Sequence, residues 1–229
     1  MSSMPAPINT IVKTILFPMF MGGILFSIAG DIRWMMGWLF FLLYVILTFL
    51  LAGIFSHKHE DLVKERKTAI KKAVWWDKIF FPLIAVFIPL AILVISALDH
   101  RFNWTRALPL YIQIIFYIIS GIGCWITYSA MQANPFFSSV VRIQSDREQM
   151  VIKKGPYRFV RHPGYVGAIF YNISMPLALG SLWGLIPGIM EMILFVLRTK
   201  LEDVLLQKEL TGYREYAEVV KYKLLPFVW

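Results

Sequence analysis

Residues 109–133 read PLYIQIIFYIISGIGCWITYSAMQA, an apolar run that contains no charged side chain. At 1.5 Å per helical residue, such a run is long enough to cross a hydrocarbon core of about 30 Å. Three further runs without charge precede it, at residues 14–30, 34–55 and 79–98. The sequence therefore predicts four membrane helices within residues 1–133.

A fifth apolar region, residues 163–197, carries one charged residue, Glu191. Gly180-Ser-Leu-Trp-Gly184 and Pro187-Gly188 interrupt it near its middle, which predicts a tight hairpin of two short helices. The tail that follows shows two amphipathic pieces separated at Gly212. We therefore expect an all-α polytopic membrane helix bundle of about six membrane segments with amphipathic C-terminal helices, and we treat residues 1–229 as a single membrane domain.

The charge of the chain indicates how it is oriented. Of 229 residues, 58% are hydrophobic and 16% are charged, and the 23 basic against 14 acidic residues give a net charge of +9. This excess alone would suggest nucleic-acid binding, but the apolar fraction argues against it. Nineteen of the 23 basic residues fall in residues 56–78, in residues 132–162 or after residue 197. The positive-inside rule then places both termini and both long loops in the cytoplasm.

Other residue types add less. Cys124 is a single cysteine, so it cannot form an intramolecular disulfide or a thiolate cluster. His57 and His59 have no evident third ligand, and we expect no metal site. Trp125 is expected to pack in the core, whereas seven tryptophans near the ends of the apolar runs are expected to form an interfacial belt. These seven are Trp34, Trp38, Trp75, Trp76, Trp104, Trp183 and Trp229.

The densest polar stretch is VIKKGPYRFVRHPGYVG at residues 151–167. Gly155-Pro156 and His162-Pro163-Gly164 are turn signals that exclude a long regular helix here. The residues alone leave two interpretations open. The stretch is either a basic interfacial loop whose arginines meet lipid phosphates or part of a ligand site.

The last apolar helix carries a stripe of charged residues. Glu191, Arg198 and Glu202 are spaced i, i+7 and i+11, which places them within about 20° of one line on a helix. A carboxylate inside a membrane is costly and is a functional-site hypothesis by default. A structural pair for Glu191 and a simple salt bridge between Arg198 and Glu202 are the alternatives. Asp203 points about 100° away.

Five short motifs together resemble the isoprenylcysteine carboxyl methyltransferase family of integral membrane enzymes, and the resemblance covers residues 144–229. The motifs are Gly155-Pro-Tyr-Arg-Phe-Val-Arg-His-Pro-Gly-Tyr-Val-Gly167, Pro176-Leu-Ala-Leu-Gly-Ser-Leu-Trp183, Arg198-x-x-x-Glu202-Asp203, Gly212-Tyr-x-x-Tyr216 and Leu225-Pro-x-x-Trp229. Asp203 stands where the family usually has a second glutamate. The resemblance implies that residues 134–229 form a cofactor-binding catalytic region behind the four helices of residues 1–133.

The resemblance also implies roles for individual residues. It implies S-adenosylmethionine as the cofactor, a site on the cytoplasmic side, and Arg198 and Glu202 as catalytic residues. Arg198 and Glu191 are the expected substrate-binding residues. The cofactor-binding residues that it implies are Gln149, Met150, Val151, Ile152, Tyr157, His162, Pro163, Gly164, Tyr165 and Glu202.

The expected reaction is O-methylation of an isoprenylcysteine-type carboxylate on a lipophilic or prenylated substrate from the lipid bilayer. A carboxylate is already ionised, so this reaction needs positioning and desolvation more than a general base. Two alternative activities stay open, and a non-catalytic membrane protein or lipid-binding scaffold is a third alternative. An amine acceptor, as in phospholipid methyltransferases, would give Glu191 or Glu202 a proton to remove, and sterol reductases have a similar C-terminal half with a nicotinamide cofactor.

Overall fold

The computed structural model describes residues 8–57 and 70–229, and every regular element in these ranges is helical. One continuous helical stretch, Asp77–Phe102, contains a π turn that lies between Pro82 and Pro89, which have no backbone N–H to donate to the preceding turn. The elements are α1 (Ile8–Ala29), α2 (Met35–His57), α4 (Asp77–Pro82), η1 (Leu83–Phe87), α5 (Ile88–Phe102), α6 (Leu110–Ala133), η2 (Ser145–Arg147), η3 (Gly155–Arg158), α7 (Pro163–Ala178), α8 (Leu185–Glu209) and α9 (Tyr213–Val219).

The four predicted apolar runs each correspond to helix. Asp77–Phe102 and α6 are long and apolar enough to cross a membrane, and Ile15–Ala29 and Met35–Leu50 are shorter apolar stretches. An all-α fold of apolar helices is therefore confirmed for the described residues. The number of six membrane segments stays a prediction.

The predicted hairpin forms between α7 and α8, but the turn between its two helices is shorter than expected. The turn passes through Gly180, whose φ of +84° is a left-handed conformation that favours glycine. Pro187-Gly188, predicted to interrupt the apolar region, instead lies in the first turn of α8, where a backbone N–H has no partner within the helix. Helix α8 is 25 residues long and ends at Glu209, so it joins the second arm to the first amphipathic piece of the tail.

Helices α6 and α7 approach each other closely through two glycines. A Cβ atom on Gly123 would lie 2.6 Å from the carbonyl oxygen of Gly167, so neither position accepts a side chain without separating the helices. A buried apolar cluster joins α1, α2, α5 and α7 on another side of the bundle. Its members are Leu25, Ala29, Trp34, Met36, Phe40, Leu93, Ala97, Met175 and Leu179.

Two tryptophan predictions were wrong. Trp34, expected at an interface, is buried and stacks on His100 with ring centroids 4.2 Å apart. Trp125, expected in the core, is 67% exposed. The contact between α6 and α7 is made by Gly123 and its neighbours, and Trp125, two residues further along, stacks on Tyr128 instead.

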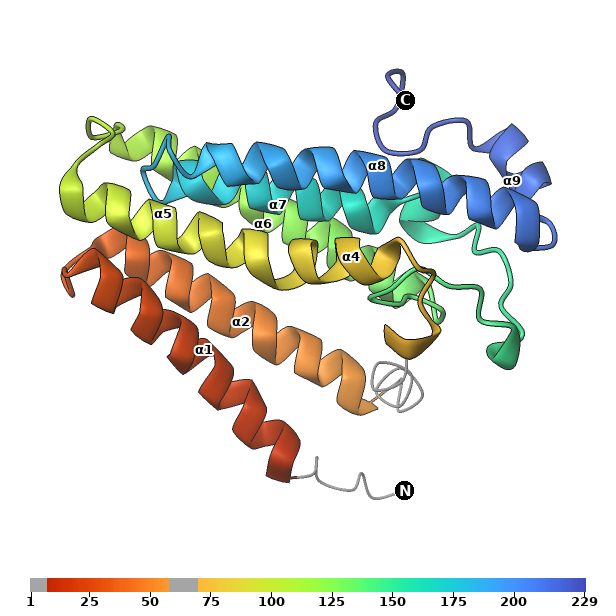
Figure 1. Ribbon diagram of the computed structural model, residues 1–229, viewed down its shortest axis with the longest axis horizontal. Helices are drawn as coiled ribbons and strands as arrows, with labels where there is room; N and C mark the ends of the chain where they lie inside the picture. The colour runs from red at the N-terminus through yellow and green to blue at the C-terminus, as the bar shows by residue number, and fades with distance from the viewer. Residues whose placement is uncertain (1–7, 58–69) are drawn as a thin grey trace.

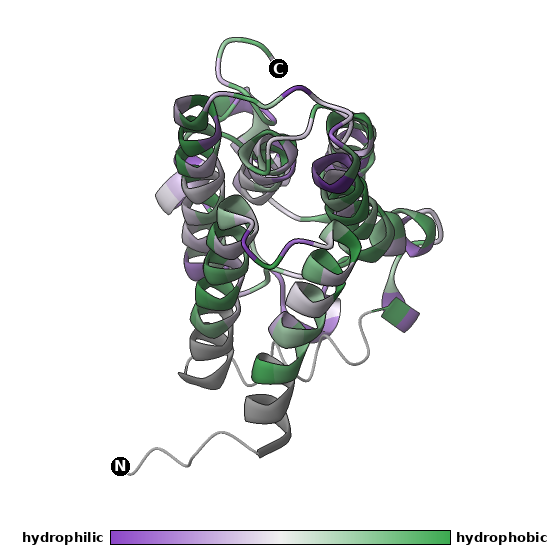
Figure 2. Cartoon of the chain, turned by 90° about the vertical axis from the view of Figure 1, so that its left-hand side faces the viewer, coloured by the Kyte–Doolittle hydropathy of each residue, from purple (hydrophilic) through white to green (hydrophobic). Residues whose placement is uncertain are grey.

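The connections sort to the two ends of the bundle. The segment 134–162 and α9 lie at the right in Figure 1, the start of α1 and the end of α2 lie below and nearer the middle, and the short connections 30–34, 103–109 and 179–184 lie at the left. Seen from that left end, most helical turns are hydrophobic (Figure 2). The described parts of the segments that the charge analysis placed on one side, among them residues 70–78, 134–162 and α9, therefore lie away from the end that holds the short connections. Which side of a membrane this end faces stays a prediction.

Candidate active site

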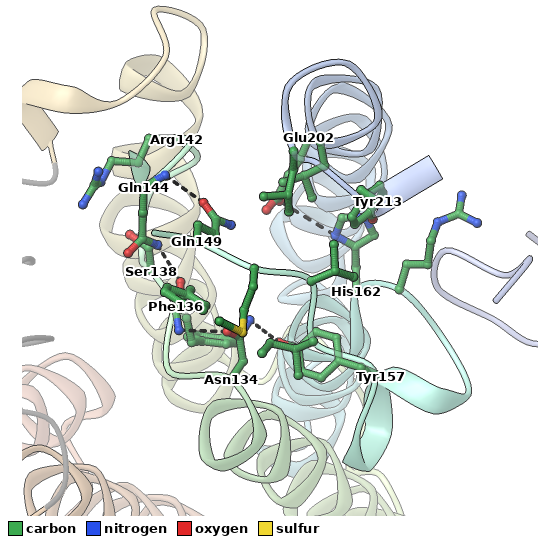
Figure 3. A pocket seen from close by; sticks show the side chains of 18 of the residues that line it. Asn134, Phe136, Ser138, Arg142, Gln144, Gln149, Tyr157, His162, Glu202 and Tyr213 are labelled. Carbon is green, nitrogen blue, oxygen red and sulfur yellow. Dashed lines mark hydrogen bonds and ion pairs between the residues drawn. The ribbon is translucent and has the colours of Figure 1, made fainter. Parts of the chain in front are cut away.

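A pocket opens at the end of the bundle where segment 134–162 meets α7, α8 and α9 (Figure 3). Nine of the ten predicted cofactor-binding residues line it, and Pro163 does not. The lining residues are Asn134, Phe136, Phe137, Ser138, Val140, Arg142, Gln144, Gln149, Met150, Val151, Ile152, Tyr157, Arg161, His162, Gly164, Tyr165, Glu202, Leu206, Leu210, Tyr213 and Tyr216.

One wall of the pocket is the irregular segment that follows α6. Gln144 is 1% exposed and holds this wall together, because its side-chain amide donates to the carbonyl of Phe136 at 2.6 Å. Its backbone N–H donates to Oε1 of Gln149 at 2.7 Å (Figure 3). Asn134, at the end of α6, donates to the hydroxyl of Tyr157 at 3.2 Å. These bonds give the wall a defined shape without a helix or strand.

The opposite wall presents the carboxylate of Glu202. The hydroxyl of Tyr165 donates to Oε2 of Glu202, and Nδ1 of His162 lies 3.9 Å from the same oxygen. The Glu202 side chain is 21% exposed, and a carboxylate has room for about four hydrogen bonds. Glu202 can therefore accept further hydrogen bonds from a cationic or hydroxyl donor inside the pocket.

Asp203, whose role the sequence left open, fastens the C-terminal tail beneath this wall. Both of its oxygens pair with Arg161, at 2.7 and 3.0 Å, and it also accepts from Tyr213 at 3.1 Å. Arg161 in turn donates to the carbonyls of Val220 and Lys221. Burial, and then the charge of Asp203, raises the pKa of Tyr213, so its hydroxyl keeps its proton and donates. Leu206, Leu210, Tyr213 and Tyr216 then close the pocket from the tail side.

Arg198 is buried behind the pocket and does not line it. Its Nη2 donates to Oδ2 of Asp77 at 2.9 Å, and its Nε lies 2.8 Å from Oδ1 of Asp77. Its Cζ lies 5.3 Å from the ring centroid of Tyr165, which lines the pocket. Sequence reasoning missed Asp77. The available signal was a carboxylate that directly follows Trp75-Trp76 at the start of an apolar helix, where it needs a partner.

Glu191 lies apart from the pocket. It is 1% exposed, and its Oε1 accepts a hydrogen bond from Asn172 at 3.1 Å. Its Oε2 has no hydrogen-bond partner among the described residues. The three residues of the predicted stripe therefore meet three different partners, Asn172, Asp77 and Tyr165, instead of one shared site.

The described residues contain no group of three or more side chains that suits a metal ion. The side chains of His57 and His59 fall outside the described part of the chain.

Comparison with known proteins agrees with the motifs. Over 61 residues the chain is 33% identical to the protein-S-isoprenylcysteine O-methyltransferase of Schizosaccharomyces pombe. The match spans 26% of this chain and 26% of that protein, so this chain covers about a quarter of the relative's length. The sequence model of the isoprenylcysteine carboxyl methyltransferase family matches residues 112–208, which hold α7, most of α8 and much of the pocket wall. The predicted resemblance to the isoprenylcysteine carboxyl methyltransferase family is thereby confirmed for residues 112–208.

Proposed function

We propose that this protein is an S-adenosylmethionine-dependent methyltransferase that methylates the carboxylate of a lipophilic, isoprenylcysteine-type acceptor. One observation carries the proposal. The pocket combines a partly exposed carboxylate at Glu202, aromatic walls at Phe136 and Tyr157 and the apolar segment 149–152, and a buried arginine lies directly behind Tyr165.

The chemistry of the pocket fits the proposed cofactor. The ammonium and ribose hydroxyls of S-adenosylmethionine suit the carboxylate of Glu202, and the adenine suits the aromatic and apolar walls. Gln144 and Gln149 already bond to each other across the wall, which orients it before a ligand arrives. When bound, the cofactor supplies a sulfonium methyl group that an acceptor oxygen takes as the bond from sulfur to methyl breaks. The protein's own task is to orient both partners and to exclude water.

An arginine beside the pocket favours a carboxylate over an amine as the acceptor. The guanidinium of Arg198 can donate a charge-assisted hydrogen bond to a carboxylate, whereas it would repel a protonated amine. A lipophilic acceptor is also supported by a second, apolar cavity between α1, α2, α5 and α7, whose lining includes Asn172, the partner of Glu191. We further propose six membrane segments, with the pocket at the cytoplasmic end of the bundle.

Ligand-dependent thermal stability of the detergent-solubilised full chain tests this function. S-adenosylhomocysteine at about 100 times its Kd should stabilise the wild type by about 2.7 kcal/mol. The Glu202→Gln and His162→Ala variants should lose this stabilisation. Glu209→Gln should keep it, because Glu209 is an exposed residue of the same helix that does not line the pocket.

The alternatives give different results in this assay and in an assay of methyl transfer to candidate acceptors. Stabilisation by NADPH without stabilisation by S-adenosylhomocysteine would replace the proposal with a reductase. Methyl transfer to an amine lipid, with none to a prenylated cysteine carboxylate, would keep the cofactor and reject the acceptor. Stabilisation of the Glu202→Gln and His162→Ala variants equal to that of the wild type would reject the proposed cofactor residues.

A further inference from the structure

Asp77 connects the N-terminal part of the chain to the candidate active site. It lies in the first turn of α4, outside residues 112–208, and it is 0% exposed. Its partner Arg198 lies 121 residues further along the chain and is 4% exposed. Removing two charges from water is costly, so a pair this deeply buried requires specific contacts to hold it.

Both members of the pair are fixed by the same short stretch of the pocket wall. The backbone N–H of Val141 donates to Oδ2 of Asp77 at 2.6 Å. The Nη2 of Arg198 donates to the carbonyl of Ser139 at 2.8 Å. A backbone bond from Val74 to Val141, at 3.1 Å, adds a third tie between the approach to α4 and this wall. The neighbouring residues Ser138, Val140 and Arg142 line the pocket.

Only some of the N–H donors of the Arg198 guanidinium are used by its neighbours. Asp77 and Ser139 accept hydrogen bonds from Nη2, whereas Nε lies 2.8 Å from Oδ1 of Asp77 as an ion-pair contact without a hydrogen bond. Nη1 has no hydrogen-bond partner among the described residues. The guanidinium cannot turn freely, because Nη2 makes two hydrogen bonds and Cζ lies 5.3 Å from the ring centroid of Tyr165. The side of the arginine that carries Nη2 is thus fixed by the protein, and Nη1 has room for a further acceptor group.

We infer that Asp77 is a positioning residue, which orients Arg198 so that Nη1 faces the carboxylate of the methyl acceptor. This inference rests on the proposed function and deepens it, because it assigns the N-terminal part of the chain a role in recognising the acceptor. Asp77 acts through Arg198 and does not itself contact the cofactor or the reacting atoms.

The experiment compares Asp77→Asn with the wild type in the full-length, detergent-solubilised protein. Asparagine keeps the size of the side chain but loses one acceptor oxygen and the charge that complements the fork. With N-acetyl-S-farnesylcysteine as the acceptor, we expect its KM to rise at least tenfold. The affinity for S-adenosylhomocysteine should stay within about twofold, because no cofactor-lining side chain changes.

Two further variants separate positioning from a general structural effect. Asp99→Asn changes the other buried aspartate of the same helical stretch, so it should lower thermal stability without raising the acceptor KM. In a double-mutant cycle, Arg198→Lys and Asp77→Asn should not be additive in kcat/KM, since one residue acts through the other.

Each outcome has one meaning. An active wild type whose acceptor KM is unchanged or lower in Asp77→Asn overturns the inference and leaves the proposed function intact. A tenfold rise in KM that Asp99→Asn reproduces also overturns it, because the effect is then one of stability. A wild type that neither binds S-adenosylhomocysteine nor transfers methyl overturns the proposed function, and this inference with it.

Discussion

The helical stretch Asp77–Phe102 carries a buried aspartate near each end, and the two are satisfied differently. Asp77 faces the charged guanidinium of Arg198 and the backbone N–H of Val141. Asp99, at the end with the short connections, accepts from the backbone and hydroxyl of Thr105, both at 2.6 Å, and from the hydroxyl of Ser181 at 2.5 Å. One aspartate therefore has a cationic partner and the other has neutral donors alone among the described residues.

This difference separates a structural role, at Asp99, from a position that can still bind a ligand group, at Asp77. Around Asp99 both hydroxyls are fully used within the network. Those of Ser181 and Thr105 donate to Asp99, and they accept from the backbone N–H groups of Gly184 and Leu182. The network ties the connection 103–109 to the hairpin turn. Around Asp77 the arginine retains unused donors beside a pocket. The same residue type on one helix thus fixes the fold at one end and serves the site at the other.

Removal of Asp77 should cost the most stability. In Asp77→Ala the charge of Arg198 stays buried without its partner, and breaking such a pair costs about 3–5 kcal/mol. Reversible unfolding in mixed micelles would measure the loss. A loss below about 1 kcal/mol would show that Arg198 finds water or another partner, and the contrast between the two aspartates would then lose its physical basis.

Removal of Asp99 should cost less. Asp99→Ala deletes an acceptor for three neutral donors, and leaving buried donors unsatisfied costs about 1–3 kcal/mol in total if Thr105 and Ser181 partly pair with each other. The same unfolding assay applies, with acceptor KM as the control that should not change. If Asp99→Ala lost as much stability as Asp77→Ala, the charge of Arg198 would not be what makes Asp77 costly to remove.

The sequence predicted helices well and tertiary partners poorly, for physical reasons. Apolar runs without charge are local signals, so residues 79–98 and 109–133 were located within a few residues. The spacing of Glu191, Arg198 and Glu202 correctly placed them along one helix. Their partners Asn172, Asp77 and Tyr165 come from other segments, however, and helical periodicity carries no information about which segments meet.

The candidate site shows the same limit. Motifs at 155–167 and 198–203 predicted residues that now line one pocket or support it. The wall formed by Asn134, Phe136 and Gln144 was missed, because its shape depends on side-chain bonds to backbone carbonyls in a segment without periodicity. Pro187-Gly188 was misread as an interruption since a proline signals a helix start as readily as a helix end.

Loss of a single neutral donor should have a smaller effect than loss of either aspartate. Ser181→Ala removes one of three hydrogen bonds to Asp99 and leaves the two from Thr105. We expect a loss of about 1 kcal/mol, the net contribution of one hydrogen bond. Thermal unfolding beside Ser145→Ala, a serine in an exposed turn, would measure it. A loss as large as that of Asp99→Ala would make Ser181 the principal partner in the network.

The pocket end also holds an ion pair that should contribute almost nothing, and it tests whether burial is what makes the Asp77 pair strong. Lys72 lies 2.6 Å from Asp146, but their side chains are 50% and 44% exposed. Arg142 and then Lys72 hold the pKa of Asp146 below its ordinary value of 3.8. A lowered folded-state pKa gives stability that is complete above that ordinary value and is lost only as the pH falls through the folded-state pKa.

Lys72→Ala should therefore leave the unfolding midpoint unchanged between pH 5 and pH 8, and any small loss at low salt should disappear in 0.5 M NaCl, because exposed charges are screened. Thermal scans at two salt concentrations would measure this. A clear loss that persists at high salt would mean that an exposed pair fastens the approach to α4 to the pocket wall. Proximity of opposite charges, and not burial, would then explain the strength expected for Asp77 and Arg198.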